Sequence, residues 1–239
     1  MARMAHPDPA APRLAALAAL LADETRAAFC LALLDGRAWT AGELARYASV
    51  APSTASEHLG KLVAGGLLAE ERQGRHRYLR LADERVAHLV EDLAARVLDS
   101  APERPRTLSA VNAGSAMARG RTCYDHLAGR IGIAITDAMT ARGLLEQDTG
   151  FALTAGGLRW FDGLGIGLET GSRRPLVRSC LDWTERRPHL AGVAGAALCR
   201  HALDTGWCVR IGSGRAVKAT PDGERALYEH LGIEPATIR

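Results

Sequence analysis

The sequence lacks the features that mark secreted, membrane-spanning or disulfide-bonded proteins. Its 239 residues include five cysteines, an odd number, and no two of them form a Cys-x-x-Cys pair. No apolar run reaches the roughly eighteen residues that a transmembrane helix needs. The N-terminal stretch MARMAHPDPAAPRL has no continuous apolar core of the kind that a signal peptide carries. We therefore expect a cytoplasmic protein with reduced cysteines and no membrane partner.

Lysine and aromatic residues are also scarce. Lysine occurs only at Lys61 and Lys218, and aromatic residues make up 5% of the chain, a bias that with abundant Ala and Gly is typical of a GC-rich bacterial genome. The formal net charge of +3 does not by itself indicate nucleic-acid binding. The local distribution is more informative, because one short segment without any acidic residue contains Arg72, Arg75, Arg77 and Arg80.

Hydrophobic spacing predicts a series of helices in the N-terminal part of the chain. Apolar residues recur there at three- and four-residue intervals. Thr40 and Glu43 match a capping box, and Pro52 suits the first turn of a helix because its missing N–H has no partner there. The predicted helices cover residues 14–22, 25–34, 40–47, 52–64 and 83–98.

Two strand-like runs lie between the last two of these helices. They are LLAEER and RHRYLRL, and Gln73-Gly74 separates them with a hairpin signal. The order is helix, helix, short helix, turn, helix, hairpin, helix. It predicts a winged helix-turn-helix domain over residues 10–99, mainly α with a small β-hairpin wing.

The helix that begins at Pro52 has two contrasting faces. Its apolar stripe comprises Ala55, Leu59, Leu62 and Val63, and the opposite face carries short hydroxylated side chains. Short polar side chains near a helix N-terminus allow close approach to the major groove and can bond base edges and phosphates. A solvated surface helix would show the same pattern.

The arginine-rich hairpin decides between these interpretations. A projecting wing with several arginines and no nearby acid fits phosphate or minor-groove contact. Together the helix and the wing predict binding to double-stranded DNA. The predicted DNA-binding residues are Ser53, Thr54, Ser56, Glu57, His58, Lys61, Arg72, Arg75 and Arg77.

The N-terminal module resembles the ArsR/SmtB-type bacterial repressors. The resemblance is carried by DETRAAFCLALLDGR, TAGELARYASVAPSTASEHLGKLVAGGLL and AEERQGRHRYLRL, and it runs from about Leu14 to Val97. It implies a homodimer that binds a palindromic operator and releases it on sensing a ligand. In such proteins the first and last helices form the dimer interface, which here implies Leu14, Leu17, Leu21, Leu89 and Leu93.

The chain departs from the metal-sensing members of that family. Those proteins carry a Cys-x-Cys motif on the helix before the turn, whereas this chain has ELARYAS, without a thiol. We therefore do not expect that metal site. Cys30 lies in an apolar helix and is most simply a core residue.

The C-terminal part contains an internal repeat. Residues 100–107 form a proline-containing linker, and HLAGRIGIAITDAMTARG from His126 then aligns with HLAGVAGAALCRHALDTG from His189, an offset of 63 (189 − 126). Each copy is followed by a tail, LTAGGLRWF or ATPDGERAL, in which a Thr precedes a Gly and an apolar helix. The Thr is the predicted N-cap of that helix. We predict a duplicated domain over 108–239 with repeats at about 119–168 and 180–235, each a shortened winged helix without a reading helix. Chance similarity between Ala- and Gly-rich helices is the alternative.

Two cysteines and two histidines flank these repeats. Cys123 and His126 are three residues apart, which on a helix would place them on one face, and Cys180 with His189 could complete a four-ligand metal site. The equivalent places of the histidines favour a structural role instead, and direct ligand contact is a third possibility. Adjacent helical residues point apart, so Asp125 is not expected to orient His126, and we predict no enzymatic activity.

These observations predict a transcriptional regulator. They favour a repressor that an effector releases from its operator. No cofactor is required for DNA binding, and the effector could be a metal ion or a small molecule. Two alternatives stay open: a DNA-binding regulator without a ligand, and an interaction module whose helix-turn-helix no longer binds DNA.

Overall fold

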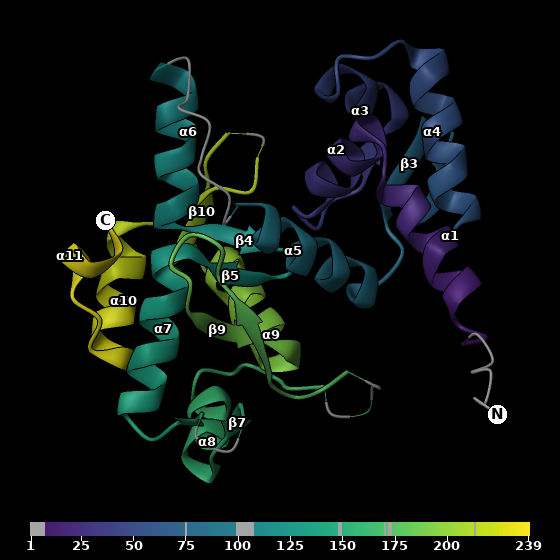
Figure 1. Cartoon of the computed structure of the whole chain (residues 1–239). Coiled ribbons are helices and arrows are strands. Elements are labelled where there is room, and N and C mark those ends of the chain that lie inside the picture. The colour runs from purple at the N-terminus through teal and green to yellow at the C-terminus, as the bar shows by residue number, and fades with distance from the viewer. Residues whose placement is uncertain are drawn as a thin grey trace, which may run out of the picture. The chain divides into compact units, whose positions relative to one another are not determined.

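The computed structural model divides into two compact units, residues 1–90 and 91–239 (Figure 1). It describes residues 8–74, 76–98, 108–147, 150–169, 171, 174–212 and 214–239. The division falls within helix α5 (Glu84–Leu98). The predicted linker at 100–107 lies outside the described residues.

Unit 1 contains the predicted series of helices. The helices of this unit before α5 are α1 (Ala11–Leu21), α2 (Glu24–Leu33), α3 (Ala41–Tyr47) and α4 (Pro52–Ala64). Their bounds agree with the predicted ones to within a few residues because each start is fixed by local chemistry. The side chain of Asp23 caps α2 by accepting from the backbone N–H of Arg26, and Thr40 caps α3.

A three-stranded antiparallel sheet completes unit 1. Strands β2 (Leu68–Gln73) and β3 (His76–Leu81) form the predicted hairpin, and β1 (Trp39–Thr40) adds to the free edge of β3. Gln73 pairs with His76 and is the last residue of β2, whereas the sequence predicted that Gln73 would belong to the turn. Gly74 has a φ of +60°, a backbone conformation that glycine adopts without strain.

We expect Thr40→Ala to lower the free energy of unfolding of unit 1 by about 1 kcal/mol. The Thr40 hydroxyl accepts from the N–H of Glu43, and the Glu43 carboxylate accepts from the N–H of Thr40 at 2.7 Å. The N–H of Thr40, and also its hydroxyl, which donates to the same carboxylate at 2.7 Å and is removed by the substitution, lower the pKa of Glu43. The capping contribution is therefore complete above the ordinary glutamate pKa and is lost as the pH falls through the lowered value.

Urea unfolding followed by hydrogen exchange of unit 1 peptides, at neutral and at acidic pH, measures this difference. Thr205→Ala in unit 2, where the hydroxyl only bonds the carbonyl of His201, is the control and should leave unit 1 unchanged. A loss of equal size at both pH values would contradict the role given to Glu43.

Unit 2 begins at Glu91 and repeats one order of elements. After α6 (Leu108–Arg119), its first half contains β4 (Arg121–Cys123), β5 (His126–Ala128), α7 (Gly129–Ala141), β6 (Leu145–Glu146), β7 (Ala152–Leu153) and α8 (Ala155–Gly163). The second half contains β8 (Arg178–Leu181), β9 (Pro188–Ala191), α9 (Gly192–Asp204), β10 (Cys208–Arg210), β11 (Val217–Ala219), α10 (Pro221–Leu231) and the short α11 (Pro235–Ile238). Each half is thus hairpin, helix, hairpin, helix.

The two halves pack against each other reciprocally. Strand β5 contacts α9, and β9 contacts α7. Thr154 caps α8 through the N–H of Gly157, and Thr220 caps α10 through the N–H of Gly223, as the sequence predicted. This common order supports the predicted duplication, which stays a prediction.

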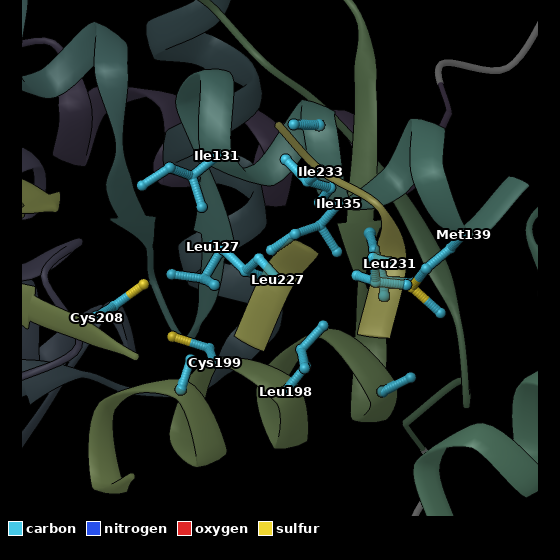
Figure 2. Close-up of a cluster of buried hydrophobic side chains, with 14 of the residues drawn as sticks. Leu127, Ile131, Ile135, Met139, Leu198, Cys199, Cys208, Leu227, Leu231 and Ile233 are labelled. Atoms are coloured by element: carbon cyan, nitrogen blue, oxygen red, sulfur yellow. The ribbon is translucent and has the colours of Figure 1, made fainter. Parts of the chain in front are cut away.

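The core of unit 2 lies between helices from both halves (Figure 2). Leu127, Ile131, Ile135 and Met139 from the first half meet residues of α9 and α10 from the second. Cys199 and Cys208 belong to the same apolar cluster, and burial raises the pKa of both thiols to about 12. No helix within the described residues is both long and apolar enough to span a membrane.

Candidate nucleic-acid interface

Helix α4 is anchored by its apolar stripe. Ala55, Leu59 and Leu62 are buried, and the helix contacts α2, α3 and β2. Val63, which the sequence placed in the same stripe, is only half-buried. The turn at 48–51 connects α3 to α4 and includes Ser49 at a φ of +54°. This anchoring directs the opposite face of α4 toward solvent.

The outward face of α4 begins with hydroxyl groups that have no partner. Ser53 and Ser56 are exposed and Thr54 is half-buried, and none of the three hydroxyls makes a hydrogen bond within the described part of the chain. The first backbone bond of the helix runs from the N–H of Ala55 to the carbonyl of Ala51, and no side chain caps the helix. The N–H groups of Ser53 and Thr54 therefore stay available at the positive end of the helix dipole.

Lys61 is paired with an acid on the same helix. Its ammonium donates to the Glu57 carboxylate at 2.7 Å, and this bond lowers the pKa of Glu57. Both side chains are at least half exposed. An exposed pair of this kind is worth little, so Lys61 can exchange Glu57 for a phosphate at small cost.

His58 lies differently from the other predicted contacts. Its side chain is 16% exposed, with Nδ1 3.3 Å from Nη1 of Arg26 and 3.4 Å from Oδ1 of Asp23. It therefore packs against α2 and its preceding turn, and not on the outward face. Its place one step from the apolar stripe explains this inward orientation.

The wing carries fewer free charges than the sequence indicated. Arg72 and Arg77 are cross-strand neighbours, and Glu70 accepts from Nε of Arg77 at 2.8 Å and lies 3.5 Å from Nε of Arg72. The Arg77 bond lowers the pKa of Glu70. The expectation of a wing without a compensating acid is therefore wrong. Arg72 still projects, with 78% of its side chain exposed, and Arg75 lies outside the described residues.

The helices assigned to dimerisation expose apolar side chains. Leu14 is 67% exposed and Leu93 is 43% exposed, values high for leucine. Leu17, Leu21 and Leu89 are half-buried. This arrangement leaves apolar surface on α1 and α5 that a partner could cover.

The structure brings together the four candidate metal ligands, which all lie in unit 2. Cys123, His126, Cys180 and His189 are buried, and their donor atoms all lie within 4.8 Å of one another. The prediction that Cys123 and His126 share one face of a helix is wrong. The two residues pair with each other across the β4–β5 hairpin. The expectation for Asp125 is also wrong, because its Oδ1 lies 3.3 Å from Nδ1 of His126.

Sequence reasoning missed a buried ion pair in unit 2. Arg121 and Asp182 are fully buried, with Nη2 and Oδ2 2.9 Å apart. Trp183 covers the guanidinium, whose carbon lies 4.4 Å from the ring centroid. No local pattern indicates this pair, because its members are distant in the sequence and each resembles an ordinary surface charge.

The α3–turn–α4 pair with its β-hairpin wing defines a winged helix-turn-helix protein. Residues 21–71 match the family described as helix-turn-helix domain. The chain is 40% identical over 227 residues to the HTH-type transcriptional regulator YdfF of Bacillus subtilis (strain 168), covering 93% of this chain and 99% of that protein. The chain belongs to the HTH-type transcriptional regulators.

Other similar proteins match less than half of the chain. HTH-type transcriptional regulator CmtR of Mycobacterium tuberculosis (strain ATCC 25618 / H37Rv) is 34% identical over 104 residues, which cover 44% of this chain and 87% of CmtR. The solved homodimeric domain Mb0332 of Mycobacterium bovis is 30% identical and covers 45% of this chain and 98% of its own, with a TM-score of 0.34. YdfF matches unit 2 as well.

Proposed function

We propose that this DNA-binding regulator reads its operator with the outward face of α4 and holds the phosphates with the β2–β3 wing. The observation that carries the proposal is the start of α4, where three hydroxyls without a partner among the described residues adjoin two backbone N–H groups that have no acceptor there. Hydroxyls can bond base edges in the major groove, and free N–H groups at a helix N-terminus bind phosphate oxygens. The apolar stripe beneath keeps this face outward.

Two copies of the chain form the DNA-binding species in this proposal. The exposed leucines of α1 and α5 supply apolar surface for a homodimer, and a two-fold protein dimer matches a palindromic operator. Repression, and release by an effector, are what the resemblance to ArsR/SmtB repressors implies.

Selection from a pool of randomised duplexes tests the proposal. The full chain should enrich an inverted repeat whose half-sites are separated by about one helical turn, roughly 10 bp, or a multiple of it. Beads without protein are the control. Failure to enrich any sequence beyond this control would overturn the proposal, and enrichment of an asymmetric site would overturn the dimer.

We expect Arg72→Ala and Lys61→Ala each to weaken binding to all duplexes alike. Both side chains are exposed and can exchange their acidic neighbour for a phosphate. Each substitution should reduce the slope of log affinity against log salt by about 1, because one phosphate contact is lost.

Fluorescence anisotropy across a salt series, on selected and scrambled duplexes, measures both slopes. Arg159→Ala, an exposed arginine of α8 in unit 2, is the matched control and should change neither slope. An unchanged slope for both α4 and wing variants would show that these charges do not face DNA.

A further inference from the structure

We propose that Cys123, His126, Cys180 and His189 form a tetrahedral Zn²⁺ site that joins the two halves of unit 2. The site does not depend on DNA binding. It is also separate from the Cys-x-Cys position of the metal-sensing ArsR/SmtB proteins, where this chain has no thiol.

The spacing of the donor atoms fits a zinc ion. The two Sγ atoms are 3.9 Å apart, and the two Nε2 atoms are 3.1 Å apart. Tetrahedral zinc with Zn–S of about 2.3 Å and Zn–N of about 2.0–2.1 Å requires separations of about 3.8 Å and about 3.3–3.4 Å. A disulfide would need the sulfurs about 2.05 Å apart. A Cys₂His₂ donor set is also typical of closed structural zinc sites.

The fold builds the site from two equivalent hairpins. Cys123 pairs directly with His126 across β4–β5, and Cys180 pairs directly with His189 across β8–β9. Each half thus contributes one thiol and one imidazole from neighbouring strands. All four side chains are at most 5% exposed, so solvent does not compete for an ion bound there.

Glycine allows the two halves to approach this closely. A Cβ at Gly195, on α9, would lie 3.2 Å from Cβ of His126 and 2.6 Å from the carbonyl oxygen of Leu190. Gly132 occupies the equivalent place on α7, where a Cβ would lie 2.4 Å from the carbonyl oxygen of Leu127. The repeated His-Leu-Ala-Gly-x-x-Gly pattern therefore supplies both a ligand and the space for the ligand of the other half.

Carboxylates lie behind both histidines. Oδ1 of Asp125 lies within hydrogen-bond distance of Nδ1 of His126, at 3.3 Å, whereas Oδ2 of Asp182 is 3.8 Å from Nδ1 of His189, too far for a hydrogen bond. A carboxylate behind a metal-binding imidazole holds the proton on the far nitrogen and leaves the near one free to bind the metal. The two Nε2 atoms face each other at 3.1 Å, a contact that is favourable with a proton on one of them or a cation between them.

The chemistry of the site balances the charge of a divalent ion. When Zn²⁺ binds, each thiol loses its proton to solvent, and two thiolates with two neutral imidazoles leave the site uncharged. Without the ion, the Cys123 thiol donates to Oε1 of Glu91 at 2.7 Å. The released protons are therefore a direct measure of thiolate coordination.

Metal analysis of the purified full chain tests the proposal. Reduced protein incubated with Zn²⁺ and desalted should hold one zinc ion per chain, and Co²⁺ in its place should show four-coordinate ligand-field bands with sulfur-to-cobalt charge transfer. Cys180→Ser should weaken zinc binding by more than ~100-fold, and Asp125→Asn, which keeps every ligand, by about 10–100-fold. Circular dichroism checks that each variant is folded.

Cys30→Ala, which removes a buried thiol of unit 1, is the matched control and should still bind one ion. The proposal is overturned if the reduced wild-type chain binds no zinc, or if Cys180→Ser binds it as tightly as wild type. A Cys123–Cys180 disulfide in the metal-free chain that withstands reductant, detected as a mass lower by two hydrogen atoms, would also overturn it.

Discussion

The double substitution Ser53→Asp, Ser56→Asp should lower the affinity for the selected duplex by at least ~100-fold at fixed salt. Each lost base contact is worth about 1–3 kcal/mol, and two carboxylates facing the phosphates add repulsion. The loss would not arise from unfolding. Ser53 lies in the first turn of α4, where a negatively charged side chain interacts favourably with the positive end of the helix dipole.

Fluorescence anisotropy with the full chain measures this loss. Ser115→Asp introduces one such carboxylate on the exposed surface of α6 in unit 2 and should leave the affinity within about twofold of wild type, since surface substitutions change free energies little. If the double variant bound as tightly as wild type, the outward face of α4 would not lie on the duplex.

Asp182→Ala should lower the free energy of unfolding of unit 2 by about 3–5 kcal/mol. The carboxylate faces the buried Arg121 guanidinium and also accepts from the N–H groups of Gly129, Thr184 and Glu185. Burial alone would raise the pKa of Asp182, but the guanidinium and these bonds hold it well below its ordinary value. Its removal leaves a positive charge buried without compensation.

The exposed ion pair between Asp137 and Arg187 is the matched control, with 44% and 55% of the side chains exposed. Asp137→Ala should cost no more than about 1 kcal/mol, because solvent screens the pair. Urea unfolding of both variants, followed by hydrogen exchange of unit 2 peptides, gives the comparison. Equal losses would show that Asp182 is not the counter-ion of a buried charge.

The sequence predicts unit 1 well because its determinants are local. Helical periodicity, the Thr40–Glu43 capping box and Pro52 each act within a turn or two of helix, and they set the bounds of α3 and α4. The wing pattern likewise predicts β2 and β3. Its error concerned Glu70, which lies just before the arginine segment and reaches Arg77 across the hairpin.

The metal candidates show what local spacing does not determine. A separation of three residues fits one face of a helix, but Tyr124 adopts a φ of +58° and reverses the chain, so Cys123 meets His126 across two strands. The meeting of the two hairpins depends on the packing of α7 against β9 and of α9 against β5. That packing is a tertiary property, and the repeat indicated only that both halves would be alike.

Hydrogen exchange of the full chain, free and bound to the selected duplex, tests most directly whether α4 lies on DNA. The N–H groups of Ser53 and Thr54 have no helical acceptor and should exchange fast in the free protein. We predict that the duplex slows exchange in peptides covering 50–57 and 68–80 and leaves those covering α7 and α9 unchanged. Unchanged exchange at the start of α4, with protection elsewhere or nowhere, would contradict the account.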